Sequence, residues 1–141
     1  MMKRKIVLSI ILVMVLLLAL TGCNTGSNSK IGKDYAEEYY DAFSDQDYEE
    51  CASMFHESLV EDVGGEDTLF EIYDNMEIAW GKLTDYEVKQ TGFYSSGGET
   101  DVDLEIDVTY STGMTATDAM TVWVLKDGTA YITMISTGDP Q

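Results

Sequence analysis

The feature that most constrains the fold is a strict alternation of apolar and polar residues between positions 101 and 110. The apolar set is Val102, Leu104, Ile106, Val108 and Tyr110, and the polar set is Asp101, Asp103, Glu105, Asp107 and Thr109. Side chains of a strand point to opposite faces in turn, so this pattern predicts a strand with one buried face and one wet face. Strands buried on both faces have continuous apolar runs instead, so we expect an antiparallel sheet.

Three further strands are predicted on either side of this one, at residues 84–94, 114–126 and 129–136. The segments between them are rich in turn-forming residues, namely Ser95-Ser96-Gly97-Gly98, Ser111-Thr112-Gly113 and Asp127-Gly128. Short turns join successive antiparallel strands, so the four strands are predicted to form a meander.

Helical periodicity occupies the residues before the sheet. Apolar residues recur every three or four positions in three stretches, from Asp34 to Phe43, from Tyr48 to Leu59 and from Leu69 to Trp80. The third helix is expected to begin near Glu66–Thr68 and to stop at Gly81. Three helices followed by a meander predict an α+β domain, with N-terminal helices packed on one face of a curved antiparallel four-stranded sheet.

The first 22 residues have the properties of an export signal. Three positive charges lie within Met1–Lys5, and an almost unbroken apolar run extends from Ile6 to Leu20. A transmembrane helix needs roughly 20 apolar residues, so the shorter run favours a cleaved leader over a permanent span. The residues that follow, Leu20-Thr21-Gly22-Cys23, resemble the lipobox of bacterial lipoproteins.

The lipobox resemblance implies cleavage after Gly22 and a diacylglyceryl group on the sulfur of Cys23. Two acyl chains would hold the chain at the extracytoplasmic face of the cell membrane. Ordinary secretory cleavage beside an incidental cysteine is the alternative. Because residues 24–30 are small and polar, we expect residues 23–32 to be the lipidated cysteine and a flexible tether, and residues 33–141 to be the folded domain.

The acidic balance of the chain restricts its partners. The formal net charge is −18, and loss of Lys3, Arg4 and Lys5 with the leader makes it about −21. Such a field repels phosphate backbones, so nucleic acid is not expected as a partner. A cationic envelope partner suits the charge better, and the simpler alternative is that the charge only keeps an exported surface soluble.

The order of the elements resembles the NTF2-like (cystatin-like, cone-shaped) superfamily, especially the small NTF2-like domains of bacterial lipoproteins. The resemblance spans Lys33 to Ser136 and rests on two stretches. They are Tyr39-Tyr40-Asp41-Ala42-Phe43 with Asp45-Gln46-Asp47-Tyr48-Glu49-Glu50, and Val124-Leu125-Lys126-Asp127-Gly128 before Tyr131-Ile132. Tyr131 stands where the family often has a tryptophan. The resemblance implies a sheet wrapped around the long helix and a conical cavity that holds different ligands, or none, in different members.

Asp118 is the residue that stands out within the third predicted strand. It shares the parity of Met114, Ala116, Met120, Val122 and Val124, so a regular strand would direct its carboxylate to the apolar side and raise its pKa. We favour instead a β-bulge, or a strand that begins only at Ala119, with Asp118 in a solvated turn. Aromatic candidates for the walls of a pocket with Asp118 are Tyr39, Tyr40, Tyr73, Trp80 and Trp123, although aromatic residues at helical spacing are more often plain core.

The residues after the leader give little support for a metal site or for a catalytic nucleophile. They contain one histidine, His56, and one cysteine besides Cys23, which is Cys51. A continuous helix would place His56 and Cys51 on different faces, and Cys51 has the spacing of a buried residue. The acidic row of residues 101–107 has carboxylates about 7 Å apart, typical of a solvated face. We therefore predict no metal and no cofactor.

Three functions are compatible with these patterns. The leading hypothesis is a non-enzymatic, membrane-tethered domain that binds a small molecule, a peptide or an envelope partner. The alternative is a proton-transfer enzyme resembling the ketosteroid isomerases, in which Asp118 would act beside Tyr39 or Tyr73. The third is a structural or dimerising accessory, and the sequence leaves the oligomeric state open.

Overall fold

The computed structural model describes residues 26–141. A long helix over residues 26–44 is followed by three shorter ones, α2 (Tyr48–Ser53), α3 (Glu57–Val63) and α4 (Glu66–Trp80). The strands are β1 (Leu83–Ser96), β2 (Glu99–Tyr110), β3 (Thr115–Val124) and β4 (Ala130–Ser136). They form one sheet in the order β1-β2-β3-β4, and every neighbouring pair is antiparallel. The predicted α+β architecture with an antiparallel meander is confirmed.

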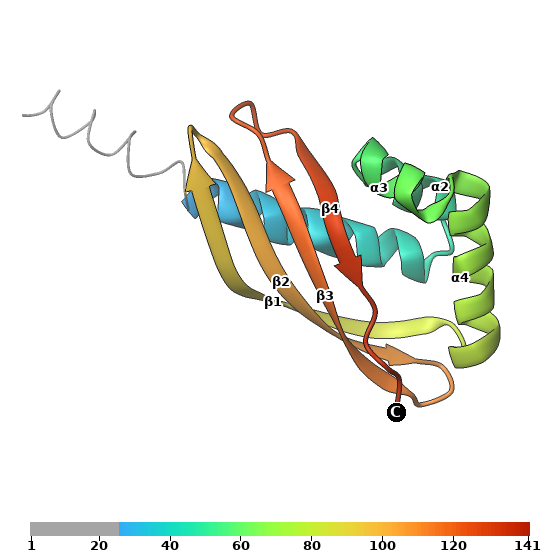
Figure 1. The fold of residues 1–141 in the computed structure, drawn as a ribbon. Coiled ribbons are helices and arrows are strands. Elements are labelled where there is room, and N and C mark those ends of the chain that lie inside the picture. Colours follow the sequence, from blue (N-terminus) through green and yellow to red (C-terminus); the bar gives the residue numbers. More distant parts are fainter. Residues whose placement is uncertain (1–25) are drawn as a thin grey trace, which may run out of the picture.

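The long helix lies across one face of the sheet, and α2, α3 and α4 gather beyond its C-terminal end (Figure 1). The alternation in β2 divides the two faces as predicted. Its apolar residues are buried, and Asp101, Asp103 and Glu105 are exposed on the outer face. The helix contributes Ala36, Tyr39, Tyr40 and Phe43 to the same core. Among the described residues no helix is both long and apolar enough to cross a membrane.

The long helix already includes most of the segment predicted to be a flexible tether. Residues 26–32 are helical, so that prediction is wrong for them, whereas residues 1–25, with the leader and Cys23, lie outside the described residues. The amide of Asn28 donates to Thr100 Oγ1 at 3.1 Å and to the carbonyl of Gly98 at 3.4 Å. Gly32 packs so closely on β2 that an added Cβ would lie 2.7 Å from Val102 Cγ2. Contacts with the sheet therefore stabilise a helical turn whose own residues have low helix propensity.

The second predicted helix is divided into α2 and α3 by a short extended segment. Ile132 donates its backbone N–H to the carbonyl of Met54 at 2.9 Å, and His56 donates to the carbonyl of Ile132 at 2.9 Å. This parallel bridge attaches Phe55 to β4. Helical periodicity cannot reveal it because the partner strand lies far along the chain. A continuous helix from Tyr48 to Leu59 is therefore a wrong prediction.

Candidate functional site

Asp118 lies inside β3, opposite Ile106 of β2, with its side chain on the inner face of the sheet. The residue is 2% exposed. The expectation of a solvated turn, or of a strand that starts at Ala119, is therefore wrong, because β3 begins at Thr115. Two donors replace the water that a buried carboxylate loses. The Tyr40 hydroxyl donates to Oδ2 at 2.8 Å, and the Gly138 backbone N–H donates to Oδ1 at 3.1 Å.

The C-terminal segment creates the second of these contacts. Ala119 pairs with Ser136 at the end of β4, and Thr115 and Gln141 then exchange backbone hydrogen bonds of 3.0 and 2.9 Å. Between these two pairs the C-terminal segment has one residue more than β3, as in a β-bulge. Gly138 lies in this bulge, where an added Cβ would collide with the carbonyl of Thr117. A bulge is thus present, but in the segment opposite Asp118 and not in its own strand.

Asp118 lines a pocket of about 180 Å³ between the long helix, α4 and the sheet. Aromatic and aliphatic side chains form most of its wall, and Asp118 is the one carboxylic acid among the lining residues that the structure describes. Tyr39 and Tyr73 line the pocket with Asp118, as their candidate role requires. Trp80 does not line it, because its ring packs on Tyr110 with 5.6 Å between ring centroids.

The hydroxyl groups of the pocket are not arranged as the sequence suggests. Tyr39 and Tyr73 bond to each other at 2.9 Å, so neither donates to Asp118. The donor is Tyr40, whose phenol has a strongly raised pKa because it is buried and lies beside the Asp118 carboxylate. Helical spacing places Tyr39 and Tyr40 on one broad apolar stripe and cannot decide between them.

Burial raises the pKa of Asp118, while the hydrogen bonds from Tyr40 and Gly138 act in the opposite direction. Tyr110 lies nearby in the same wall, and burial together with the Asp118 charge raises its pKa. Within residues 26–141 the Tyr110 hydroxyl has no hydrogen-bond partner, and no fully buried side-chain oxygen lacks one. The Tyr110 side chain lines the pocket with Asp118, although the residue is only 2% exposed. A ligand beside Asp118 could meet both an acceptor and a donor.

The rim of the pocket is mostly apolar and partly exposed. Val63, Ile72, Met76 and Ile135 are its aliphatic residues from α3, α4 and β4, and Ile72 is 40% exposed. Farther inside, Phe43, Phe55 and Leu69 are buried. The pocket thus joins an apolar mouth to one carboxylate, an arrangement suited to a ligand with an apolar body and a polar end.

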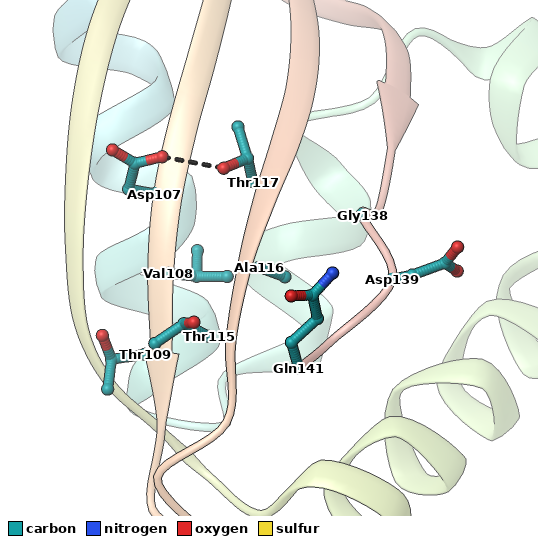
Figure 2. A pocket seen from close by; sticks show the side chains of 9 residues that line it. All are labelled: Asp107, Val108, Thr109, Thr115, Ala116, Thr117, Gly138, Asp139 and Gln141. Atoms are coloured by element: carbon teal, nitrogen blue, oxygen red, sulfur yellow. Dashed lines mark hydrogen bonds between the residues drawn. The ribbon is translucent and has the colours of Figure 1, made fainter.

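A second, polar hollow of about 540 Å³ lies where the C-terminal segment passes β3 (Figure 2). Asp107 accepts hydrogen bonds there from Thr117 at 2.9 Å and from Lys89 at 2.7 Å. The Asp139 side chain points away from Asp107 (Figure 2). The carboxylates of Asp107 and Asp139 therefore do not converge on one point. No cluster of three or more metal-ligating side chains occurs in the described part of the chain. We therefore place the candidate site at Asp118.

Cys51 and His56 have separate structural positions. Cys51 is fully buried, as predicted, and its thiol lies 3.7 Å from the carbonyl oxygen of Tyr39. His56 caps the N-terminus of α3 by accepting from the Ser58 N–H at 3.3 Å. Its ring also packs against Trp123 and Tyr131. These roles account for both side chains without nucleophilic chemistry.

Comparison of the chain with protein-family models, curated proteins and solved structures found no match. The geometry of the Asp118 pocket and the N-terminal sequence are therefore the features of this chain that bear on its function.

Proposed function

We propose that this chain is a bacterial lipoprotein whose NTF2-like domain, held outside the cell membrane by Cys23, binds a small amphipathic ligand in the Asp118 pocket. The anchor is supported by the charged start, the apolar run and the Leu20–Cys23 motif. The NTF2-like assignment is supported by a long helix packed across a four-stranded meander, with a pocket between them.

The observation that carries the binding proposal is the buried carboxylate of Asp118 in an otherwise apolar pocket. The pocket of about 180 Å³ is close in size to an apolar cavity of about 150 Å³ that accommodates benzene. It therefore suits a single ring or a short branched chain. A carboxylate at the wall favours an ammonium or another donor at the end of that group.

The hydrogen bonds to Asp118 favour binding over catalysis. Tyr40 and Gly138 each donate to a different carboxylate oxygen. Such donors hold the carboxylate in one orientation and stabilise its charged form, which makes it a better fixed acceptor and a weaker base. A preorganised acceptor needs no rearrangement when a cationic group arrives, so it improves affinity.

The binding proposal can be tested with three ring compounds of similar size. Benzylamine, benzyl alcohol and benzoate are titrated against the protein by calorimetry or by NMR shift. A charged hydrogen bond contributes about 1.5–3 kcal/mol, so Asp118→Asn should weaken benzylamine at least roughly tenfold. Asp107→Asn, on the outer face, is the matched control and should leave the affinity unchanged. Equal affinity for benzylamine and benzoate, or no effect of Asp118→Asn, would contradict the proposal.

Proton transfer is the second candidate function, and it is supported by the raised pKa of Asp118 beside the Tyr110 hydroxyl. A carboxylate base and a phenol donor are the two groups that enolisation of a ketone requires. The test is exchange of the α-protons of cyclohexanone in D₂O, followed by NMR. Acceleration that disappears in Asp118→Asn and falls in Tyr110→Phe would favour the enzyme. Binding without acceleration would favour the ligand-binding domain.

The anchor has an independent test. Mass spectrometry of the exported protein should show an N-terminus at Cys23 carrying a diacylglyceryl group. Cys23→Ser should release the protein from the membrane fraction or leave the leader uncleaved. A bare thiol at Cys23 in the mature protein would refute the anchor without affecting the pocket.

A further inference from the structure

The start of the long helix lies at the end of the sheet where two hairpin loops meet. Asn28 bonds to Gly98 and Thr100 at the β1–β2 hairpin. The side chain of Ile31 lies beside Gly128 in the loop between β3 and β4. Figure 1 shows both loops at the same end of the sheet, and α4 on the far side of the molecule, leading to the end of the sheet where β1 begins. We call this region, formed by loops 97–98 and 125–129 with the first helical turns, the hairpin end.

The spacing of the chain places the hairpin end close to Cys23. Two residues lie between Cys23 and Gly26, so the three steps of the chain from one to the other span at most about 11 Å. Tyr39 lies 13 residues farther along the helix, or roughly 20 Å. An anchor at Cys23 would therefore hold the hairpin end at the bilayer surface, with the pocket farther away.

Aromatic side chains are concentrated at this same end. Phe93 and Tyr94 are 54% and 68% exposed near the tip of β1. Across the outer face, Tyr94 pairs with Asp101, Asp101 with Trp123, and Trp123 with Tyr131. This row thus brings Tyr94, Trp123 and Tyr131 to one level of the sheet, and Phe93 extends from the opposite face. Aromatic rings with polar tips favour the headgroup level of a bilayer.

The charges of the domain are unevenly distributed along the sequence. Residues 45–80, which include α2, α3 and α4, contain twelve Asp and Glu residues and no Lys or Arg. The hairpin end has Lys30, Lys33 and Lys126 among its acids. Anionic headgroups repel this acidic segment more strongly than a segment of mixed charge. Glu57, Glu61 and Glu66 line a hollow with Tyr131, so acidic residues also border the hairpin end and the charges alone do not select an orientation.

We propose that the hairpin end docks on the lipid bilayer, with Phe93, Tyr94, Trp123 and Tyr131 at headgroup level and the ligand pocket facing away. This inference rests on the proposed anchor at Cys23. The occupant of the surface is the bilayer that carries the anchor, so the contact adds to a tether already in place and requires little affinity of its own.

The two tryptophans provide the measurement because they lie at opposite ends of β2. Trp123 pairs with Asp101 near one end of β2, and Trp80 packs on Tyr110 at the other end. The distance from Asp101 to Tyr110 along an extended strand is about 30 Å. The full chain is isolated from bacterial membranes, its lipid is verified by mass spectrometry, and it is reconstituted into phosphatidylethanolamine–phosphatidylglycerol vesicles with brominated acyl chains. Trp80→Phe then reports Trp123 alone, and Trp123→Phe reports Trp80 alone.

We expect brominated lipid to quench Trp123 and to leave Trp80 unchanged. Phe93→Ser with Tyr94→Ser should reduce the quenching of Trp123. Ile78→Ser is the matched control, because Ile78 is 84% exposed on α4, and it should have no effect. A lipidated protein in which Trp123 is unquenched, or Trp80 is quenched equally, overturns the docking proposal alone. A protein without lipid on Cys23 overturns the anchor and the docking together.

A second copy of the chain is the competing occupant of these aromatic residues. If Phe93 and Tyr94 pair two copies, the purified lipoprotein in detergent will sediment as a dimer that the double serine variant dissociates. That result, together with unquenched Trp123 in vesicles, would assign the surface to self-association and refute bilayer docking.

Discussion

The hydroxyl of Tyr40 donates to Oδ2 of Asp118 at 2.8 Å, across 78 positions of the sequence. The other carboxylate oxygen accepts from Gly138 in the C-terminal segment. One buried carboxylate therefore links the long helix, β3 and the end of the chain. It also forms the polar wall of the pocket, so the stability of the fold and the chemistry of the site depend on the same side chain.

Replacement of Tyr40 by Phe should destabilise the protein, because it removes a donor from a buried charge. Loss of such a partner costs about 1–3 kcal/mol in the free energy of unfolding, measured by urea denaturation. Tyr86→Phe is the control, since its hydroxyl donates to exposed Asp41 at 2.6 Å. Water can replace a donor there, so a smaller loss is expected. Equal losses for the two variants would show that Asp118 is hydrated in solution.

The stability of the wild type relative to Asp118→Asn should fall as the pH rises. The folded-state pKa of Asp118 is raised by burial, so its contribution is fully present below the ordinary value of 3.8 and is lost as the pH passes the raised value. For Asp107 we expect the stability difference to change with pH in the opposite direction. Its bonds from Lys89 and Thr117 lower its pKa, so the wild type should gain on Asp107→Asn as the pH rises toward and past 3.8. Urea midpoints at several pH values from 3 to 7 measure both differences, and slopes of the same sign would contradict the assignment.

The elements that could be predicted are those whose cause is local. The alternation from Val102 to Tyr110 sets the faces of β2, and the loops that contain Gly97, Gly113 and Gly128 separate the strands. Helix α4 begins at Glu66 and stops before Gly81, as its acidic first turn and C-terminal glycine indicate. Periodicity and turn chemistry are properties of neighbouring residues, so one sequence suffices to detect them.

The features that could not be predicted depend on distant partners. Asp118 is buried because Tyr40 and Gly138 supply donors, and the break after α2 exists because Phe55 bridges to Ile132. The turn around Asn28 is helical because the sheet accepts its amide. In each case tertiary contacts outweigh a local preference, and a single sequence does not show which residues will meet.

Two glycines of the long helix should respond oppositely to alanine. At Gly32 an added methyl would lie 2.7 Å from Val102 Cγ2, so Gly32→Ala should push the helix off β2 and cost about 1–3 kcal/mol. Gly26 has nothing within 4 Å of an added Cβ, so Gly26→Ala should be neutral or stabilise by up to about 1 kcal/mol. Urea denaturation and helical circular dichroism measure both. A neutral Gly32→Ala would mean that the first turns do not pack on the sheet, and would also weaken the proposed orientation at the membrane.

The thiol of Cys51 should be unreactive in the folded protein. Burial raises its pKa to about 12, so at pH 8 only about one thiol in ten thousand is ionised, and its sulfur is enclosed in the core. The Cys23→Ser variant leaves Cys51 as the single thiol of the chain. Ellman's reagent should react with it only after unfolding in guanidinium, and the rate should follow the fraction unfolded. Adding Ser53→Cys to that variant provides the control, because Ser53 is exposed on the same short helix and a thiol there should react at once. Rapid reaction of Cys51 under native conditions would show that α2 opens readily, which would leave Tyr39 and the base of the pocket exposed to water.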